Sequence, residues 1–171
     1  MQINPSGTEL IFSETNKVRK LDFATGLYFY WFVFRSRPIE TIKKLIDYVS
    51  TIAGSVYGGF QNGNALSATF YLIDSIAIDW NNSPDIIFVS DWGNNCIRMI
   101  NQTSSIVSTY TGICDRSFGY KDGPLPSALF ASPYSIRYLS SSLGTILLVA
   151  DYSNNAIRMI NITSGLFQKL I

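Results

Sequence analysis

A stretch of sixteen residues returns in similar form sixty positions later in this chain. Residues 86–101 read IIFVSDWGNNCIRMIN and residues 146–161 read ILLVADYSNNAIRMIN, so the apolar run, the acid, the paired asparagines and the IRMIN ending are all kept. A shorter echo, LIFSETNKVRKLD, covers residues 10–22. Self-similarity at a fixed period is typical of proteins built from one stacked structural unit, so the repeat restricts the fold more than composition does.

The residues around this stretch also repeat. VSTIAG at 49–54 returns as VSTYTG at 107–112, and an A-x-F motif at 68–70 returns at 128–130. Each unit is predicted to contain four short β segments, and the last three of each unit are expected at 75–80, 86–91 and 96–101, and again at 135–140, 145–151 and 156–161. Four short strands joined by turns are typical of one blade of a propeller.

This order of motifs resembles the NHL repeat, a family of propeller blades. The resemblance covers residues 49–165 well and 7–26 in part, since Glu14 replaces the repeated aspartate and no strands precede Leu10. It implies an all-β fold, a partial β-propeller of NHL-type four-stranded blades. The expected units are an incomplete first blade at 1–26, blades at 48–106 and 107–165, and the start of a further strand at 166–171.

A stretch of 21 residues, 27–47, interrupts the first unit. It combines an aromatic run with apolar positions at helical spacing after Pro38, so an irregular or helical insertion is predicted. Removing it joins LDFATG directly to YVSTIAG, which resembles the later junction of INQTSS with IVSTYTG. The insertion is therefore expected inside a hairpin turn, either as an excursion outside the fold or as a product of an incorrect gene model.

Composition narrows the classes of function. The chain has no histidine, which removes the usual general base near neutral pH and the commonest metal ligand. The zinc-dependent lyase branch of the resembled family uses histidines, so this chain does not carry that site. No nucleophile, phosphate loop or metal-ligand spacing stands out, and we expect no cofactor and no enzyme activity. The formal charge of +1 does not favour nucleic acid as a partner.

Cys96 and Cys114 are the only cysteines. Two cysteines cannot build a structural zinc site, but they could form one disulfide or remain two buried thiols. The thiol interpretation is favoured, because Cys96 falls where the second copy has Ala156, a small residue suited to a buried position.

The turn between the second and third strands of each unit carries the candidate binding residues. Asp and Asn hydrogen-bond to nearby backbone and tolerate left-handed conformations, so their recurrence has a structural explanation. Exposed aromatic residues at loop tips are favoured where proteins meet. If this protein has a partner-binding face, we expect it at these loops, with the candidates Asp91, Trp92, Asn94, Asp151, Tyr152 and Asn154.

Arg98 and Arg158 also occupy one repeat position, between Ile and Met residues. We expect them on the outer face of a strand, paired with an acid or with water, since the neighbouring apolar residues are expected to face inward. A row of arginines could instead contact phosphates, although the balanced charge argues against it.

Three asparagines match the N-glycosylation pattern: Asn81, Asn101 and Asn161. The beginning of the chain has no secretory signal pattern, and its longest apolar run, at 27–34, is too short to span a membrane. The sequence does not determine the compartment, and an extracellular location is one alternative if the chain is a fragment.

Together these features predict a binding scaffold without enzyme activity, with a protein as partner. A propeller closes with roughly 4–8 blades, and this chain supplies fewer. Its open faces should therefore meet further blades of a longer chain or a second copy, the first being favoured by the abrupt ends. The alternatives are a fragment of a propeller enzyme with its catalytic residues elsewhere, or a glycosylated cell-surface ectodomain.

Overall fold

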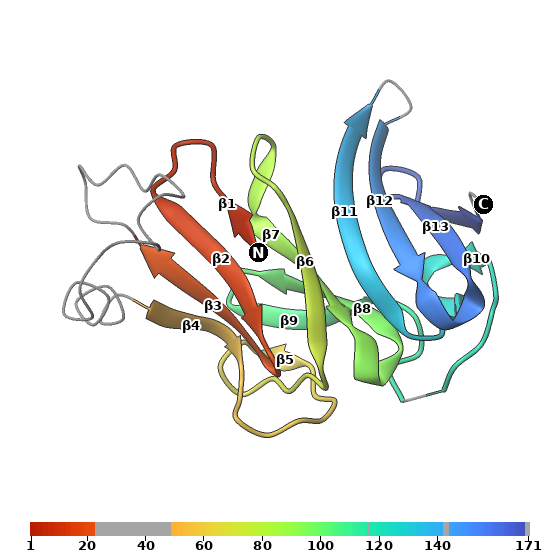
Figure 1. The fold of residues 1–171 in the computed structure, drawn as a ribbon, viewed down its shortest axis with the longest axis horizontal. Coiled ribbons are helices and arrows are strands. Elements are labelled where there is room, and N and C mark those ends of the chain that lie inside the picture. The colour runs from red at the N-terminus through yellow and green to blue at the C-terminus, as the bar shows by residue number, and fades with distance from the viewer. Residues whose placement is uncertain (23–48, 116, 142–143, 170–171) are drawn as a thin grey trace, which may run out of the picture.

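The computed structural model describes residues 1–22, 49–115, 117–141 and 144–169. Within these ranges the regular structure consists of antiparallel β strands and three short 3₁₀ turns. The strands form three sheets that follow one another along the chain (Figure 1). The all-β prediction is therefore confirmed. The predicted insertion at 27–47 lies outside the described residues.

Each sheet contains a meander of four strands, and sheets 2 and 3 each have a fifth strand of two residues. Sheet 1 has the order β1 (Gln2–Ile3), β2 (Glu9–Glu14), β3 (Lys17–Asp22), β4 (Val49–Gly54). Sheet 2 contains β6 (Ile73–Asp79), β7 (Ser83–Asp91), β8 (Cys96–Asn101) and β9 (Ile106–Thr111), and the two-residue β5 (Gly63–Asn64) pairs with β9. Sheet 3 repeats this order with β11 (Pro133–Ser141), β12 (Gly144–Asp151), β13 (Ala156–Asn161), β14 (Leu166–Lys169) and the short β10 (Gly123–Pro124) on β14.

The first sheet differs from the sequence expectation in two ways. A short strand does precede Leu10, because Ile3 of β1 pairs with Leu10 of β2. The strand at 49–54, which the repeat assigns to the unit 48–106, pairs with β3 and completes sheet 1. Residues 23–48 therefore connect two neighbouring strands, at the place where sheets 2 and 3 have only the short connections 102–105 and 162–165.

The sheets pack face to face, and two apolar clusters lie between them. The cluster between sheets 1 and 2 joins Ile11 and Val18 to Phe70, Ile76 and Val89. The cluster between sheets 2 and 3 includes these residues from the two sheets: Ala77, Phe88, Ile97, Phe130, Ile136, Leu147, Val149 and Ile160. Strand β6 of sheet 2 and strand β11 of sheet 3 lie next to each other (Figure 1). Sheet 2 is therefore buried on both faces.

The A-x-F motifs explain part of this packing. Ala68, Phe70, Ala128 and Phe130 have no exposed surface. Each phenylalanine belongs to the apolar layer that its own sheet forms with the preceding sheet. The motif therefore packs the loop that precedes sheet 2, and the loop that precedes sheet 3, against the apolar layer between neighbouring sheets.

The two cysteines form a disulfide. Cys96, at the start of β8, is bonded to Cys114, which follows β9. The prediction of two free thiols was wrong, because the pairing of β8 with β9 places residues 97 and 111 opposite each other and so brings both cysteines to one sheet end.

Candidate functional site

The repeated turn adopts the same conformation in both copies. A short 3₁₀ turn follows the aspartate, η2 (Trp92–Asn94) in sheet 2 and η4 (Tyr152–Asn154) in sheet 3. The next asparagine is left-handed, with φ of 57° at Asn95 and 49° at Asn155. The predicted left-handed turn role of the second asparagine is confirmed, since Asn tolerates this conformation better than most residues.

Asp91 and Arg98 form a buried ion pair across this turn. Nη1 of Arg98 donates to Oδ2 of Asp91 at 2.8 Å, and neither side chain has exposed surface. Arg98 also donates to the backbone oxygens of Thr69 and Gln61, and its guanidinium lies 4.9 Å from the centroid of the Phe70 ring. The arginine therefore holds the loop before sheet 2 against the sheet.

The aspartate and the first asparagine complete the same cluster. Asp91 accepts a hydrogen bond from the backbone N–H of Tyr71 at 2.8 Å. Asn94 donates to Asp91 and to the backbone oxygen of Gly59. The side chains of Asp91 and Asn94 are thus directed at the loops 59–62 and 69–71 rather than at solvent.

Sheet 3 repeats the cluster with one added charge. Arg158 pairs with Asp151 at 2.6 Å, again without exposed surface on either side chain, and Asp151 accepts from the N–H of Ala131. Arg158 also pairs with Asp122, where the first copy has the neutral Asn62. Nε of Arg158 donates to Asp122, whereas Nε of Arg98 is buried and has no hydrogen-bond partner among the described residues.

Burial disfavours the charged forms of both Asp91 and Arg98. Loss of water raises the pKa of Asp91, although the hydrogen bonds from Asn94 and Tyr71 and the charge of Arg98 oppose this shift. The same loss of water lowers the pKa of Arg98, and Asp91 opposes it. The cluster is stable only because each charge has the other as its partner.

These contacts correct the expected position of the arginines. Arg98 and Arg158 do not lie on an outer face: both side chains are fully buried, because the loop before each sheet covers its arginine. Each is paired with a carboxylate, so they do not form the exposed row that phosphate contacts would need.

The six candidate binding residues divide into two groups. Asp91, Asp151 and Asn94 are buried and Asn154 is partly buried, and all four are used within the clusters. Trp92 is partly exposed, and Tyr152 exposes 70% of its surface. The structure therefore leaves Trp92 and Tyr152 as the two candidates whose side chains reach the surface most directly.

Further aromatic residues lie at the same end of the sheets, which we call the turn end because the turns 15–16, 92–95 and 152–155 are found there. Tyr134 lies 5.9 Å from Tyr152 between ring centroids. Tyr71 contacts the turn at Gly93, and the loop 55–59 contacts Tyr71 at Gly58. We call the following set the aromatic row, in which all members except the half-buried Trp92 are exposed: Tyr57, Tyr71, Trp92, Phe118, Tyr134 and Tyr152.

Two hydrogen bonds between neighbouring sheets hold the backbone beside this row. Leu72 donates its N–H to the side chain of Asn16, and Ser132 donates its N–H to the side chain of Asn95. Only Trp92 and Tyr152 were predicted, because the other four members have no aromatic counterpart sixty positions away. The repeat pattern therefore gave no signal for them.

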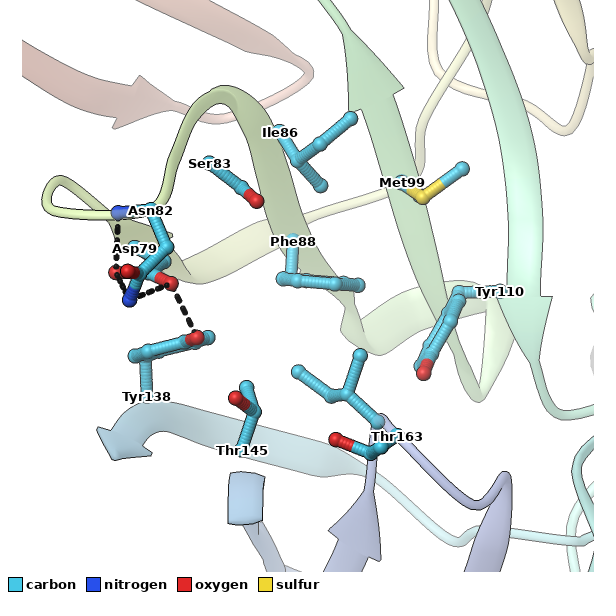
Figure 2. Close-up of a pocket in the computed structure, with 11 residues that line it drawn as sticks. Asp79, Asn82, Ser83, Ile86, Phe88, Met99, Tyr110, Tyr138, Thr145 and Thr163 are labelled. Carbon is cyan, nitrogen blue, oxygen red and sulfur yellow. Dashed lines mark hydrogen bonds between the residues drawn. The ribbon is translucent and has the colours of Figure 1, made fainter. Parts of the chain in front are cut away.

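A cleft of about 300 Å³ opens at the opposite end of the layer between sheets 2 and 3. Figure 2 shows Tyr138, Thr145 and Thr163 on one side of it and Phe88 and Met99 on the other. Sequence reasoning missed this cleft because its lining comes from six strands and two turns that are far apart in the sequence.

The three glycosylation candidates differ in their surroundings. Asn81 is exposed in the turn between β6 and β7. The side chains of Asn101 and Asn161 accept hydrogen bonds from the backbone of Ser104 and Ser164 within their hairpin turns. Among the described residues, no group of three acidic, cysteine or histidine side chains could hold a metal ion, and no helix is long and apolar enough to cross a membrane.

Comparison with known proteins supports the fold. No family model matches this chain. No curated protein sequence matches it either. Solved structures do resemble it: an auxiliary nutrient binding protein from Bacteroides thetaiotaomicron has a TM-score of 0.66 at 18% identity, over 98% of this chain and 36% of that one.

Two further structures give the same result. An auxiliary nutrient binding protein from Bacteroides ovatus has a TM-score of 0.66 at 17% identity, over 99% of this chain and 36% of its own. A putative phosphatase from B. thetaiotaomicron has a TM-score of 0.62 at 18% identity, over 93% of this chain and 33% of its own. The chain thus spans about a third of the length of these proteins, and at this identity the likeness shows the fold alone.

Proposed function

We propose that this protein is a binding scaffold without enzyme activity, and that it recognises a protein partner through the aromatic row at its turn end. The observation that carries the proposal is the exposure of Tyr152 and Tyr134 side by side on a backbone fixed by two buried ion pairs. Aromatic side chains on rigid supports lose little conformational freedom on binding and often dominate interface energies.

The turn clusters support this assignment by keeping the row in place. The backbone N–H of Tyr71 is bonded to Asp91, and that of Tyr152 to the oxygen of Ser132. The carboxylates of the two turns, Asp91 and Asp151, are buried in ion pairs with Arg98 and Arg158. This argues against acid–base chemistry at this end. Two solved structures of similar fold are named nutrient binding proteins, which agrees with a binding role in general.

Quantitative affinity capture from the native cell, with the full chain as bait, tests the proposal. A partner should be retained by the wild-type chain and by Ile106→Ala, an exposed apolar residue at the opposite end, and lost with Tyr134→Ala/Tyr152→Ala. Equal retention by all three baits would contradict the proposal, as would specific substrate turnover by the purified protein.

We also propose that the sheets are NHL-type blades and that a further blade covers the outer face of sheet 3. Leu148, Ile157 and Met159 are half-buried on that face. They occupy the repeat positions of Phe88, Ile97 and Met99, which sheet 2 buries against sheet 3. Such apolar faces are stable only against a neighbouring unit.

Light scattering tests whether the outer face of sheet 3 is uncovered when no further blade is present. A chain limited to these residues should self-associate, and Leu148→Lys should reduce the association. A strictly monomeric wild-type chain at high concentration would argue against an uncovered apolar face.

An extracellular setting is a second proposal that one observation favours. Disulfides persist mainly in oxidising compartments, and Cys96 and Cys114 are bonded here. Intact-mass measurement of the protein from its own cells should then show the bond and a glycan on the exposed Asn81. A reduced and unmodified chain would contradict this location.

A further inference from the structure

The cleft between sheets 2 and 3 is separate from the aromatic row. It lies among the hairpin turns 80–82 and 162–165, at the far end of the sheets from the turns 92–95 and 152–155. Its volume of about 300 Å³ is at the lower end of the range for small-molecule sites.

One wall of the cleft is apolar. Phe88 and Ile86 come from β7 and Met99 from β8, all in sheet 2. Phe88 packs edge-on against Tyr110 with 4.8 Å between ring centroids, which fixes both rings. This wall offers an apolar contact surface to the C–H groups of a ring-shaped ligand, with Phe88 itself largely buried behind it.

The repeat explains why there is space here. Trp80 packs against the apolar cluster between sheets 1 and 2, near the turn after β6. Sixty positions later the residue is Ser140, so the layer between sheets 2 and 3 has no corresponding indole. The cleft therefore marks a difference between two otherwise equivalent layers.

The polar groups of the cleft are mostly hydroxyls. Tyr138 donates its hydroxyl hydrogen to Asp79 (Figure 2). The hydroxyls of Tyr110, Ser83 and Thr163 also line the cleft and make no hydrogen bond with the described residues. They are available to a ligand as both donors and acceptors.

Asp79 is not available in the same way. Besides Tyr138, it accepts from the backbone N–H groups of Asn81 and Asn82, both at 3.2 Å, and from the side chain of Asn82 at 2.9 Å. A carboxylate has about four lone-pair sites, so these four donors leave none for an ammonium group. No basic residue lines the cleft, so nothing there compensates an anionic ligand.

We propose that this cleft binds a neutral, ring-shaped polyhydroxylated ligand, the chemistry of a pyranose sugar unit. The apolar ring face contacts Phe88 and Met99, and the ring hydroxyls exchange hydrogen bonds with Tyr110, Thr145 and Thr163. This site does not depend on the proposed protein-binding function, because none of its residues belongs to the aromatic row.

Ligand-observed saturation-transfer NMR of the full chain with D-glucose, D-galactose and D-mannose, each at millimolar concentration, tests the proposal. At least one sugar should bind, and D-glucuronate should bind more weakly because its carboxylate meets Asp79 and no cation. A neutral hydrogen bond is worth about fivefold in affinity, so Tyr110→Phe and Thr163→Val should each weaken binding by about that factor.

Tyr134→Phe, which also removes one exposed tyrosine hydroxyl but lies in the aromatic row, is the matched control and should leave sugar binding unchanged. Its thermal transition and those of the two cleft variants should match the wild type, since neither hydroxyl bonds within the described protein. The proposal is overturned if none of the sugars binds. It is equally overturned if sugar binding is indifferent to both cleft variants, or if glucuronate binds as tightly as glucose.

Discussion

Replacing Asp91 by asparagine should destabilise the protein strongly while preserving its shape. The asparagine keeps an oxygen for the N–H of Tyr71, but Arg98 retains its charge with neutral acceptors alone, on Thr69, Gln61 and Asn62. Removing one partner of a fully buried ion pair typically costs about 3–5 kcal/mol. That is a large part of the roughly 5–15 kcal/mol that stabilises a typical domain.

Urea denaturation followed by tryptophan fluorescence measures this loss, because Trp92 is the residue next to the substitution. The melting temperature should fall by about 6–20 °C, using about 2–4 °C per kcal/mol for a chain of this size. Glu14→Gln is the matched control: its partner Arg19 is 3.0 Å away, but Glu14 is exposed and Arg19 only partly buried, so this pair is expected to contribute less than about 1 kcal/mol.

The double variant Asp91→Asn/Arg98→Met separates the cost of an unpaired charge from the value of the pair. It should be clearly more stable than the sum of the single variants predicts, because no buried charge is left without a partner. A loss below about 1 kcal/mol for Asp91→Asn alone would refute the reasoning that this pair holds the loop to the sheet.

Three further outcomes are expected. Asn62→Asp should stabilise the protein by about 0.5–1 kcal/mol, since it gives Arg98 the second carboxylate that Asp122 gives Arg158; thermal unfolding of this variant beside the reverse change Asp122→Asn checks it. Reducing the Cys96–Cys114 bond, which closes a loop of 18 residues, should cost about 3 kcal/mol in urea unfolding, and an unchanged midpoint would contradict this. Burial opposes ionisation of Asp79, but hydrogen bonds from Tyr138 and Asn82 outweigh this effect and lower the pKa of Asp79. The contribution of Asp79 to the free energy of unfolding is therefore present above its unfolded pKa of about 4 and is lost as pH falls through the folded value. Tyr138→Phe should therefore reduce the difference in stability between neutral and acidic pH, measured by denaturant unfolding, and an unaltered difference would exclude this role.

The sequence repeat was sufficient to predict the central strands of sheets 2 and 3 and the turns that join them. Residues 86–101 and 146–161 share the apolar alternation of strands and the left-handed asparagine, which are local properties and so can be read from a single stretch of chain. The strands β7, β8, β12 and β13 end within three residues of their predicted bounds.

The position of Arg98 could not be predicted in the same way. Alternation of apolar and polar residues indicates one buried and one exposed face, but a sheet within a stack is buried on both faces. An arginine is then buried if its charge is paired, and the partner Asp91 becomes adjacent only once the turn 92–95 has formed. The disulfide depended likewise on the register of β8 and β9 rather than on sequence spacing.

The aromatic row and the cleft were hidden for a different reason. Tyr57, Tyr134 and Tyr138 have no aromatic counterpart in the other unit, so they differ between repeats that otherwise match. The proposed binding residues are those that the repeat does not share, and a search for shared residues does not detect them.

The central claim, a partner-binding surface at the turn end, is tested most directly by site-specific photocrosslinking in the native cell. A photoreactive phenylalanine is placed at position 152 in one chain and at position 106, at the opposite end, in another. The account predicts a discrete protein adduct from position 152 and none from position 106. No adduct at position 152, or the same adducts from both positions, would contradict it.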